Sequence, residues 1–160
     1  MARPPGRSWI TGVAFAAALT LGVLVGLGGF TFGYGEGWSY FSPDPANCAN
    51  CHIMNPQYDG WAKASHADVA VCNDCHLPAD FVGKWMAKAV NGFNHSWAFT
   101  FQDFHEPIQM TPSNRRILQA ACERCHADLL HPVLANAAEA PTCTRCHSDV
   151  GHGPRLGLGR

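Results

Sequence analysis

The chain has 160 residues, a formal net charge of −1 and only 14% charged residues. This length allows one small domain plus terminal extensions, and the lack of a basic excess argues against a nucleic-acid partner. Eight Cys and nine His are more than packing requires, so their spacing has to distinguish disulfides from metal or cofactor attachment.

The first predicted element is a membrane-spanning helix near the N-terminus. No charged residue occurs from Trp9 to Phe32, and these 24 residues are enough to cross a bilayer core at about 1.5 Å per residue. The stretch is longer than the apolar part of a secretory signal peptide, and no strong cleavage site follows it. We therefore expect an uncleaved anchor, with a cleaved signal as the alternative.

The charges that flank this helix predict its orientation. Arg3 and Arg7 precede the apolar stretch, whereas no Lys or Arg occurs between Tyr34 and Cys48. The positive-inside rule then places the N-terminus in the cytoplasm. We expect residues 1–34 to form the cytoplasmic N-terminus and anchor, and residues 35–160 to form a domain on the periplasmic side of the inner membrane.

A five-residue unit with two Cys and a following His occurs four times after the anchor. Each copy is C-x-x-C-H, the attachment signature of c-type haem. Two thiols three positions apart reach the two vinyl groups on one edge of the porphyrin, and the next residue points an imidazole at the iron. The four copies are Cys48-Ala49-Asn50-Cys51-His52, Cys72-Asn73-Asp74-Cys75-His76, Cys122-Glu123-Arg124-Cys125-His126 and Cys143-Thr144-Arg145-Cys146-His147.

Zinc sites and disulfides are the alternatives for eight cysteines. Paired C-x-x-C units can bind zinc, and eight thiols can form four disulfides, but neither chemistry requires His after each second Cys. The four motifs use every Cys in the chain. The sequence therefore predicts four covalently bound c-type haems.

Four haems in so short a chain constrain the fold. The 125 residues from 36 to 160 leave about 31 residues per haem, too few for an ordinary apolar core. We expect a mainly α-helical domain with much irregular structure, in which the haems form the core. Helical apolar spacing occurs in the segments Asn55–His66, Asp80–Phe93 and Ser113–His126, the last two with Asp80 and Ser113 as N-caps.

Iron in a low-spin electron carrier takes two axial ligands, commonly His with His or His with Met. The motif residues His76, His126 and His147 supply one ligand each. Of the His outside the motifs, His66 and His152 are the best candidates for second ligands. His105 and His131 are weaker candidates, and Met54 is either a core residue or a thioether ligand.

The segment from Asp80 to Phe104 is amphipathic and rich in aromatic residues. Its apolar side chains fall on one helical face, with Lys84 and Lys88 elsewhere. Such a helix suits a membrane interface, but its aromatic side chains are equally suited to packing on haem faces. The sequence leaves both interpretations open.

The chain resembles the NapC/NirT family of quinol dehydrogenases in four features. These are one N-terminal anchor, four C-x-x-C-H motifs, the opening Cys48-x-x-Cys51-His52-x-Met54-Asn55-Pro56, and Lys88 between the second and third motifs. The short chain is most similar to small subunits of cytochrome c nitrite reductases. The resemblance implies that Met54, not His52, ligates the first iron.

The same resemblance assigns further site residues. His66 and His152 match family distal ligands, and Lys88 matches a quinol-site residue. The acidic residue expected after Lys88 is missing, because His95 stands near that place and Asp103 follows eight residues later. Either of them is the candidate for its role.

The function that follows from the resemblance is oxidation of menaquinol and transfer of electrons through four haems to a periplasmic terminal reductase in anaerobic respiration. The expected partners are the lipid and quinol pool and the catalytic subunit of the ammonia-forming, multihaem cytochrome c nitrite reductase. The alternatives are donation to a nitrate or N/S-oxide reductase, and a relay module without its own quinol site. A self-contained small-molecule reductase is least favoured, because little protein remains to build a substrate pocket.

Overall fold

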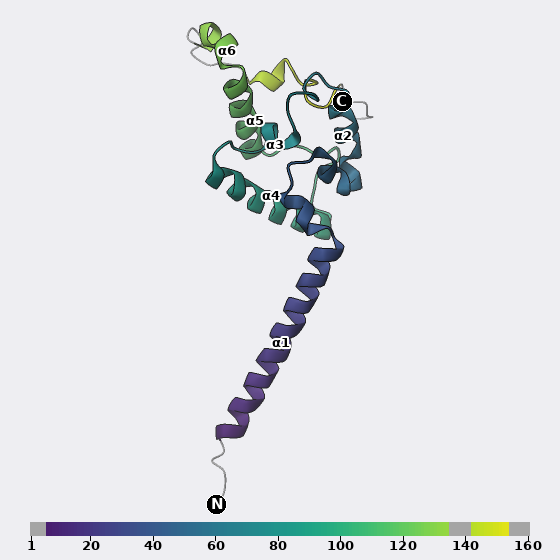
Figure 1. Cartoon of the computed structure of the whole chain (residues 1–160), viewed down its shortest axis with the longest axis vertical. Helices are drawn as coiled ribbons and strands as arrows, with labels where there is room; N and C mark the ends of the chain where they lie inside the picture. The colour runs from purple at the N-terminus through teal and green to yellow at the C-terminus, as the bar shows by residue number, and fades with distance from the viewer. Residues whose placement is uncertain (1–5, 135–141, 154–160) are drawn as a thin grey trace, which may run out of the picture. The chain divides into compact units, whose positions relative to one another are not determined.

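The computed structural model describes residues 6–134 and 142–153 (Figure 1). These residues form helices, turns and irregular segments, and no β-strand occurs in the two described ranges. The expected mainly α-helical class with much irregular structure is confirmed. Backbone contacts divide the chain into two compact units, Met1–Ser42 and Pro43–Arg160.

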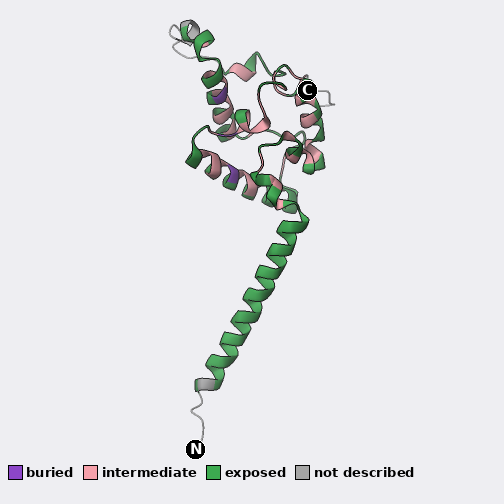
Figure 2. Ribbon diagram, in the orientation of Figure 1, coloured by how far each residue is buried: buried purple, intermediate pink, exposed green. Residues whose placement is uncertain are grey.

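The first unit consists of a long apolar helix and a short 3-10 helix. Helix α1 spans Gly6–Tyr34 and is followed by η1 at Gly37–Phe41. The 27 residues Ser8–Tyr34 are long and apolar enough to cross a membrane, and none of the best window is buried against protein (Figure 2). The expected helix is present, and its exposed apolar surface suits a lipid environment.

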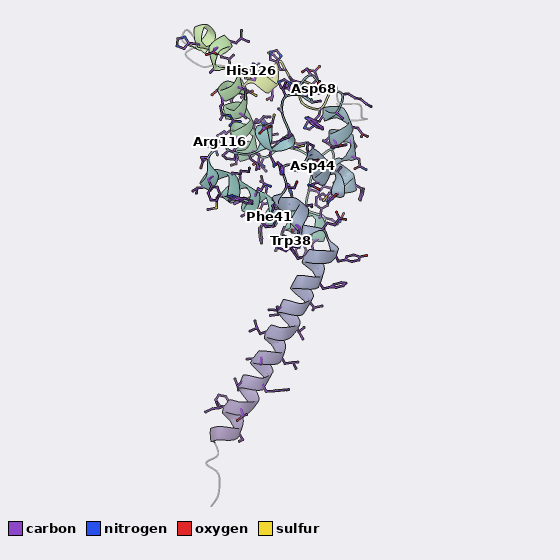
Figure 3. The ribbon with its side chains drawn as sticks, viewed as in Figure 1. Trp38, Phe41, Asp44, Asp68, Arg116 and His126 are labelled. Atoms are coloured by element: carbon purple, nitrogen blue, oxygen red, sulfur yellow. The ribbon has the colours of Figure 1, made fainter. Side chains whose placement is uncertain are left out.

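An aromatic cluster follows the apolar helix. Phe32 meets Trp38 edge to face at 5.2 Å between ring centroids, and Trp38 lies 6.1 Å from Phe41 (Figure 3). The chain turns at Glu36, whose φ of 53° is left-handed, and a Cβ built on Gly37 would collide with the Phe32 ring. Glycine is therefore needed at position 37 for the close approach of Phe32.

The second unit begins with short helices around the first motif. Helix η2 spans Pro45–Asn50, η3 spans His52–Met54 and α2 spans Asn55–Trp61. The predicted helix Asn55–His66 therefore ends five residues early. After Trp61 the chain folds back in turns, and the Trp61 indole N–H donates to the Ala70 carbonyl at 3.0 Å.

Helices α3 and α4 span Cys72–His76 and Phe81–Phe101. The predicted cap of α4 is confirmed, because the Asp80 carboxylate accepts from the Gly83 N–H at 2.6 Å. The helix runs eight residues beyond the predicted end at Phe93. Its apolar i, i+4 spacing continues through Trp97 to Phe101, which overrides the low helix propensity of Asn91 and Gly92.

Helix α5 spans Pro112–Cys125, one residue earlier at each end than the prediction. The predicted cap at Ser113 was wrong. Thr111 is the N-cap, and its hydroxyl accepts from the Asn114 N–H at 3.3 Å. Pro112 occupies the first helical position, where its fixed φ is favourable. The sequence did not predict α6 at Ala127–Leu134 or the 3-10 helix η4 at Cys143–Arg145.

The described side chains of the second unit do not form an apolar core. Leu77 and Ala121 are the only buried hydrophobic residues in the described ranges, and no large side chain there is fully buried (Figure 2). A domain of this size normally buries most of its apolar side chains. The interior is therefore shaped for something other than protein side chains.

Candidate functional site

All four C-x-x-C-H motifs lie on helical turns. The first is at the end of η2, the second forms α3, the third ends α5 and the fourth lies on η4. Residues three apart on a helical turn share one side, so each pair of thiols is presented together. None of the eight cysteines forms a disulfide in the structure, so all of them are available for thioether bonds.

The first and second motifs lie next to each other. The Cys48 and Cys72 side chains are hydrogen bonded, and this contact is the main reason that the pKa of Cys48 falls to about 7, with the nearby Lys88 ammonium adding to the effect. The same contact and burial raise the pKa of Cys72. These thiols do not titrate once they are thioethers, but the contacts place Lys88 close to the first attachment site.

The third motif is close to both the second and the fourth. Arg124 donates to the Asp74 carbonyl at 3.0 Å, which joins the third motif to the second. Burial, followed by the nearby Cys143 and Cys75, raises the pKa of Cys122. The attachment sites therefore form a continuous series from the first motif to the fourth.

Two motif histidines each face a histidine from a distant segment. The rings of His76 and His152 have centroids 5.9 Å apart at an interplanar angle of 30°. The rings of His66 and His126, the latter at the end of α5 in Figure 3, are 6.1 Å apart at 72°. The structure thus brings both leading candidates, His66 and His152, to the motif histidines of other segments.

These ring separations test whether the site fits haem. An iron atom bonded at about 2 Å to a nitrogen on each face holds two imidazole ring centres about 6 Å apart. Both observed pairs match this spacing. Together with the missing apolar core and the free thiols, the residues fit covalently attached haems.

His152 packs against Gln57 and Gly60 of α2, a contact that we call the His152 seat. Its Nδ1 lies 2.8 Å from the Gln57 carbonyl oxygen, so a proton on Nδ1 donates there and leaves Nε2 as a lone-pair donor for a metal. A Cβ built on Gly60 would collide with the His152 backbone carbonyl, so the close approach depends on glycine. Sequence reasoning missed Gln57 and Gly60, because a backbone carbonyl and an absent side chain leave no motif.

The first motif is followed closely by Met54, the candidate thioether ligand. His52 is exposed, whereas Met54, two residues later on η3, is half-buried. Neither His52 nor His147 has a facing imidazole among the described residues. The remaining candidates, His105 and His131, are exposed and belong to neither histidine pair.

Lys88 is the most buried charged side chain among the described residues. It is 6% exposed, and its Nζ lies 5.5 Å from the centroid of the Trp85 ring. Burial, and to a lesser degree Lys84, lowers the pKa of Lys88. His95 lies two turns further along α4, and partial desolvation lowers its pKa. Both His95 and Asp103, which follows the helix, are exposed.

The histidine pairs and attachment motifs define a c-type cytochrome with an N-terminal apolar helix long enough to span a membrane. The NapC/NirT cytochrome c family, N-terminal region, matches residues 9–156. The protein belongs to this family, as expected, and carries covalently bound haem.

Two relatives and one solved structure are similar to the chain. It is 37% identical to the cytochrome c-type protein NrfH of Wolinella succinogenes over 126 residues, covering 78% of this chain and 71% of the relative. It is 32% identical to the cytochrome c nitrite reductase subunit NrfH of Nitratidesulfovibrio vulgaris over 79 residues, 49% of each chain. The crystal structure of a cytochrome c nitrite reductase NrfHA complex bound to the inhibitor HQNO matches with a TM-score of 0.63 and 29% identity, covering 88% of this chain and 90% of that one.

Proposed function

We propose that this protein is a membrane-anchored quinol dehydrogenase that oxidises menaquinol and passes electrons through four c-type haems. Its electron acceptor is the catalytic subunit of the ammonia-forming cytochrome c nitrite reductase. The observation that carries the proposal is the 37% identity to an NrfH protein over a region that includes complete attachment motifs. The match to an NrfHA complex supports the choice of partner.

In this proposal residues 1–34 are the cytoplasmic N-terminus and anchor, and residues 35–160 are the haem domain on the periplasmic side. Arg3 and Arg7 favour a cytoplasmic N-terminus. The 27-residue candidate span supports a single crossing of the inner membrane.

Bound haem supplies the one-electron chemistry, and this chain supplies its attachment and its axial ligands. The eight motif cysteines hold four haems. His76 with His152 and His126 with His66 ligate the second and third haems, as their facing rings suggest. Met54 ligates the first iron and His147 the fourth, with His105, His131 or a residue of the partner subunit as the second ligand of the fourth.

The quinol site lies beside the first haem. Oxidation of a quinol releases two protons, so the site needs a donor that holds a quinol oxygen and groups that accept protons. Lys88 is the donor, because it is buried and near Cys48. His95 or Asp103 accepts a proton.

The apolar face of α4 supports access from lipid. Phe81, Val82, Met86 and Phe93 are each more than 60% exposed, an unusual density of large apolar side chains on a helix in contact with water. A helix of this kind suits the boundary between lipid headgroups and acyl chains, where an apolar quinol is available.

Reduction by a menaquinol analogue is the decisive experiment. We expect the purified full-length protein in lipid nanodiscs to be reduced by the analogue, and to pass electrons to added nitrite reductase. Reduction by dithionite without reduction by the analogue would instead indicate the relay module. Transfer to a nitrate or N/S-oxide reductase but not to nitrite reductase would correct the partner.

A further inference from the structure

Helix α4 presents two different faces. The large apolar side chains on one side, Val82, Met86, Val90, Phe93 and Trp97, are each at least half exposed. Lys88, in contrast, is 6% exposed on the opposite side. The rotation of α4 about its own axis therefore decides whether Lys88 faces the first attachment motif.

The backbone of α4 has little to fix this rotation. No Cα atom of α4 lies within 8 Å of a Cα atom of another helix in the described part of the chain. An open recess of about 420 Å³ separates α4 from the start of α5.

Two asparagines bridge the space between α4 and α5. The Asn114 amide nitrogen donates to the Asn91 amide oxygen at 3.0 Å, and the Asn91 amide nitrogen donates to the Asn114 oxygen at 3.4 Å. Both residues are partly buried. Asn91 lies three residues after Lys88, so the two side chains share one face of α4.

We propose that the Asn91–Asn114 pair is a positioning clamp that sets the rotation of α4. It holds Lys88 toward the first attachment motif and leaves Val82, Phe93 and Trp97 exposed. The clamp touches neither quinol nor haem and acts only through the direction of Lys88. Its consequence for catalysis rests on the proposed quinol site.

The chemistry of the pair provides a specific test. Asp has nearly the shape of Asn but no donor, so Asn91→Asp or Asn114→Asp alone keeps one hydrogen bond. The double Asp variant keeps none and places two carboxylates together, which repel. A clamp therefore predicts two mild single variants and a double variant whose defect exceeds the sum of theirs.

The experiment uses full-length holoprotein in nanodiscs and measures KM and kcat for a menaquinol analogue, HQNO affinity, haem content and dithionite reduction. Loss of one net hydrogen bond changes an equilibrium constant roughly fivefold. We therefore expect Asn91→Leu and Asn114→Leu to raise KM and weaken HQNO binding by about 3- to 10-fold. Haem content and dithionite reduction should be unchanged. Asn94→Leu is the matched control, because Asn94 is exposed on the same helix and has no side-chain hydrogen bond among the described residues.

The outcomes separate the clamp from the proposed function. If Lys88→Leu slows quinol oxidation while Asn91→Leu and the double Asp variant behave like Asn94→Leu, the clamp is wrong and the quinol site stands. If Lys88→Leu also oxidises quinol normally, the quinol site itself is wrong. If Asn91→Leu fails to assemble, the Asp series decides: additive single effects overturn the clamp, and a larger combined defect supports it.

Discussion

The imidazole Nδ1 of His152 lies 2.8 Å from the backbone carbonyl oxygen of Gln57, 95 positions earlier in the chain. This hydrogen bond selects the tautomer with its proton on Nδ1, which leaves Nε2 directed away from α2 as a lone-pair donor. The opposing ring is that of His76 in the second motif. A contact between residues far apart in the chain thus orients the imidazole that we propose as one axial ligand.

The seat of His152 gives the first prediction. Gly60→Ala adds a methyl group where the His152 carbonyl lies, so the loop has to move away. We expect one low-spin haem to become high-spin while all haems stay attached, as measured by electron paramagnetic resonance and haem content. Gly151→Ala is the control, since its Cβ would meet nothing within 4 Å, and it should keep the wild-type spectrum. An unchanged spectrum in Gly60→Ala would mean that the seat does not hold the ligand.

The two histidine pairs give the second prediction. Because His66 faces His126 and His152 faces His76, His66→Ala and His152→Ala should each convert a different haem to high-spin. The double variant should show both changes together. Met54→Ala should alter a further haem, the first, and His52→Ala should leave the iron spectra unchanged. If His66→Ala or His152→Ala leaves the spectrum intact, that histidine is a packing residue and not an iron ligand.

Lys88 gives the third prediction. Lys88→Leu removes the buried donor near Cys48 and should slow reduction by a menaquinol analogue by roughly 10²- to 10⁴-fold, the usual range for a catalytic proton donor or acceptor. Dithionite reduction should stay at the wild-type rate, because dithionite does not need the quinol site. Lys84→Leu, one turn earlier on α4, is the matched control. A wild-type rate in Lys88→Leu would favour the relay module.

Haem number gives the fourth prediction. The mass of the mature chain should exceed that of the polypeptide by four haems, and no free thiol should react with an alkylating reagent. The basis is that all eight cysteines are present as four C-x-x-C-H pairs on helical turns. Two or three haems, or reactive thiols that remain, would contradict this count.

The sequence predicted features that depend on local chemistry. The N-terminal apolar helix, the Asp80 cap and the helical class follow from residue spacing within single segments, and the structure contains them. The ends of α2 and α4 were misplaced because distant contacts decide them, such as the Trp61 indole bond to Ala70. Serine is a favourable N-cap residue, so the sequence predicts a cap at Ser113. Pro112 occupies the first helical position instead, which makes Thr111 the N-cap.

The candidate site also contains some residues that the sequence predicted and others that it did not. Cysteine and histidine spacing identified the motifs and pointed to His66 and His152, because those residue types carry the chemistry themselves. The pairing of each His with a particular motif was not predictable, since it depends on how segments 60 and 76 positions apart meet. Gln57 and the Asn91–Asn114 pair act through a backbone carbonyl and two common amides, and neither forms a recognisable pattern.

The scarcity of buried hydrophobic residues in the second unit has a consequence for biogenesis. With only Leu77 and Ala121 buried in the described ranges, the polypeptide has little drive to collapse before its prosthetic groups arrive. Haem attachment and folding are then one process, because each haem that is attached orders the segment of chain around it. A defect in a single motif should therefore expose the whole domain to proteases, so such variants would disappear from the cell rather than persist as partly active carriers.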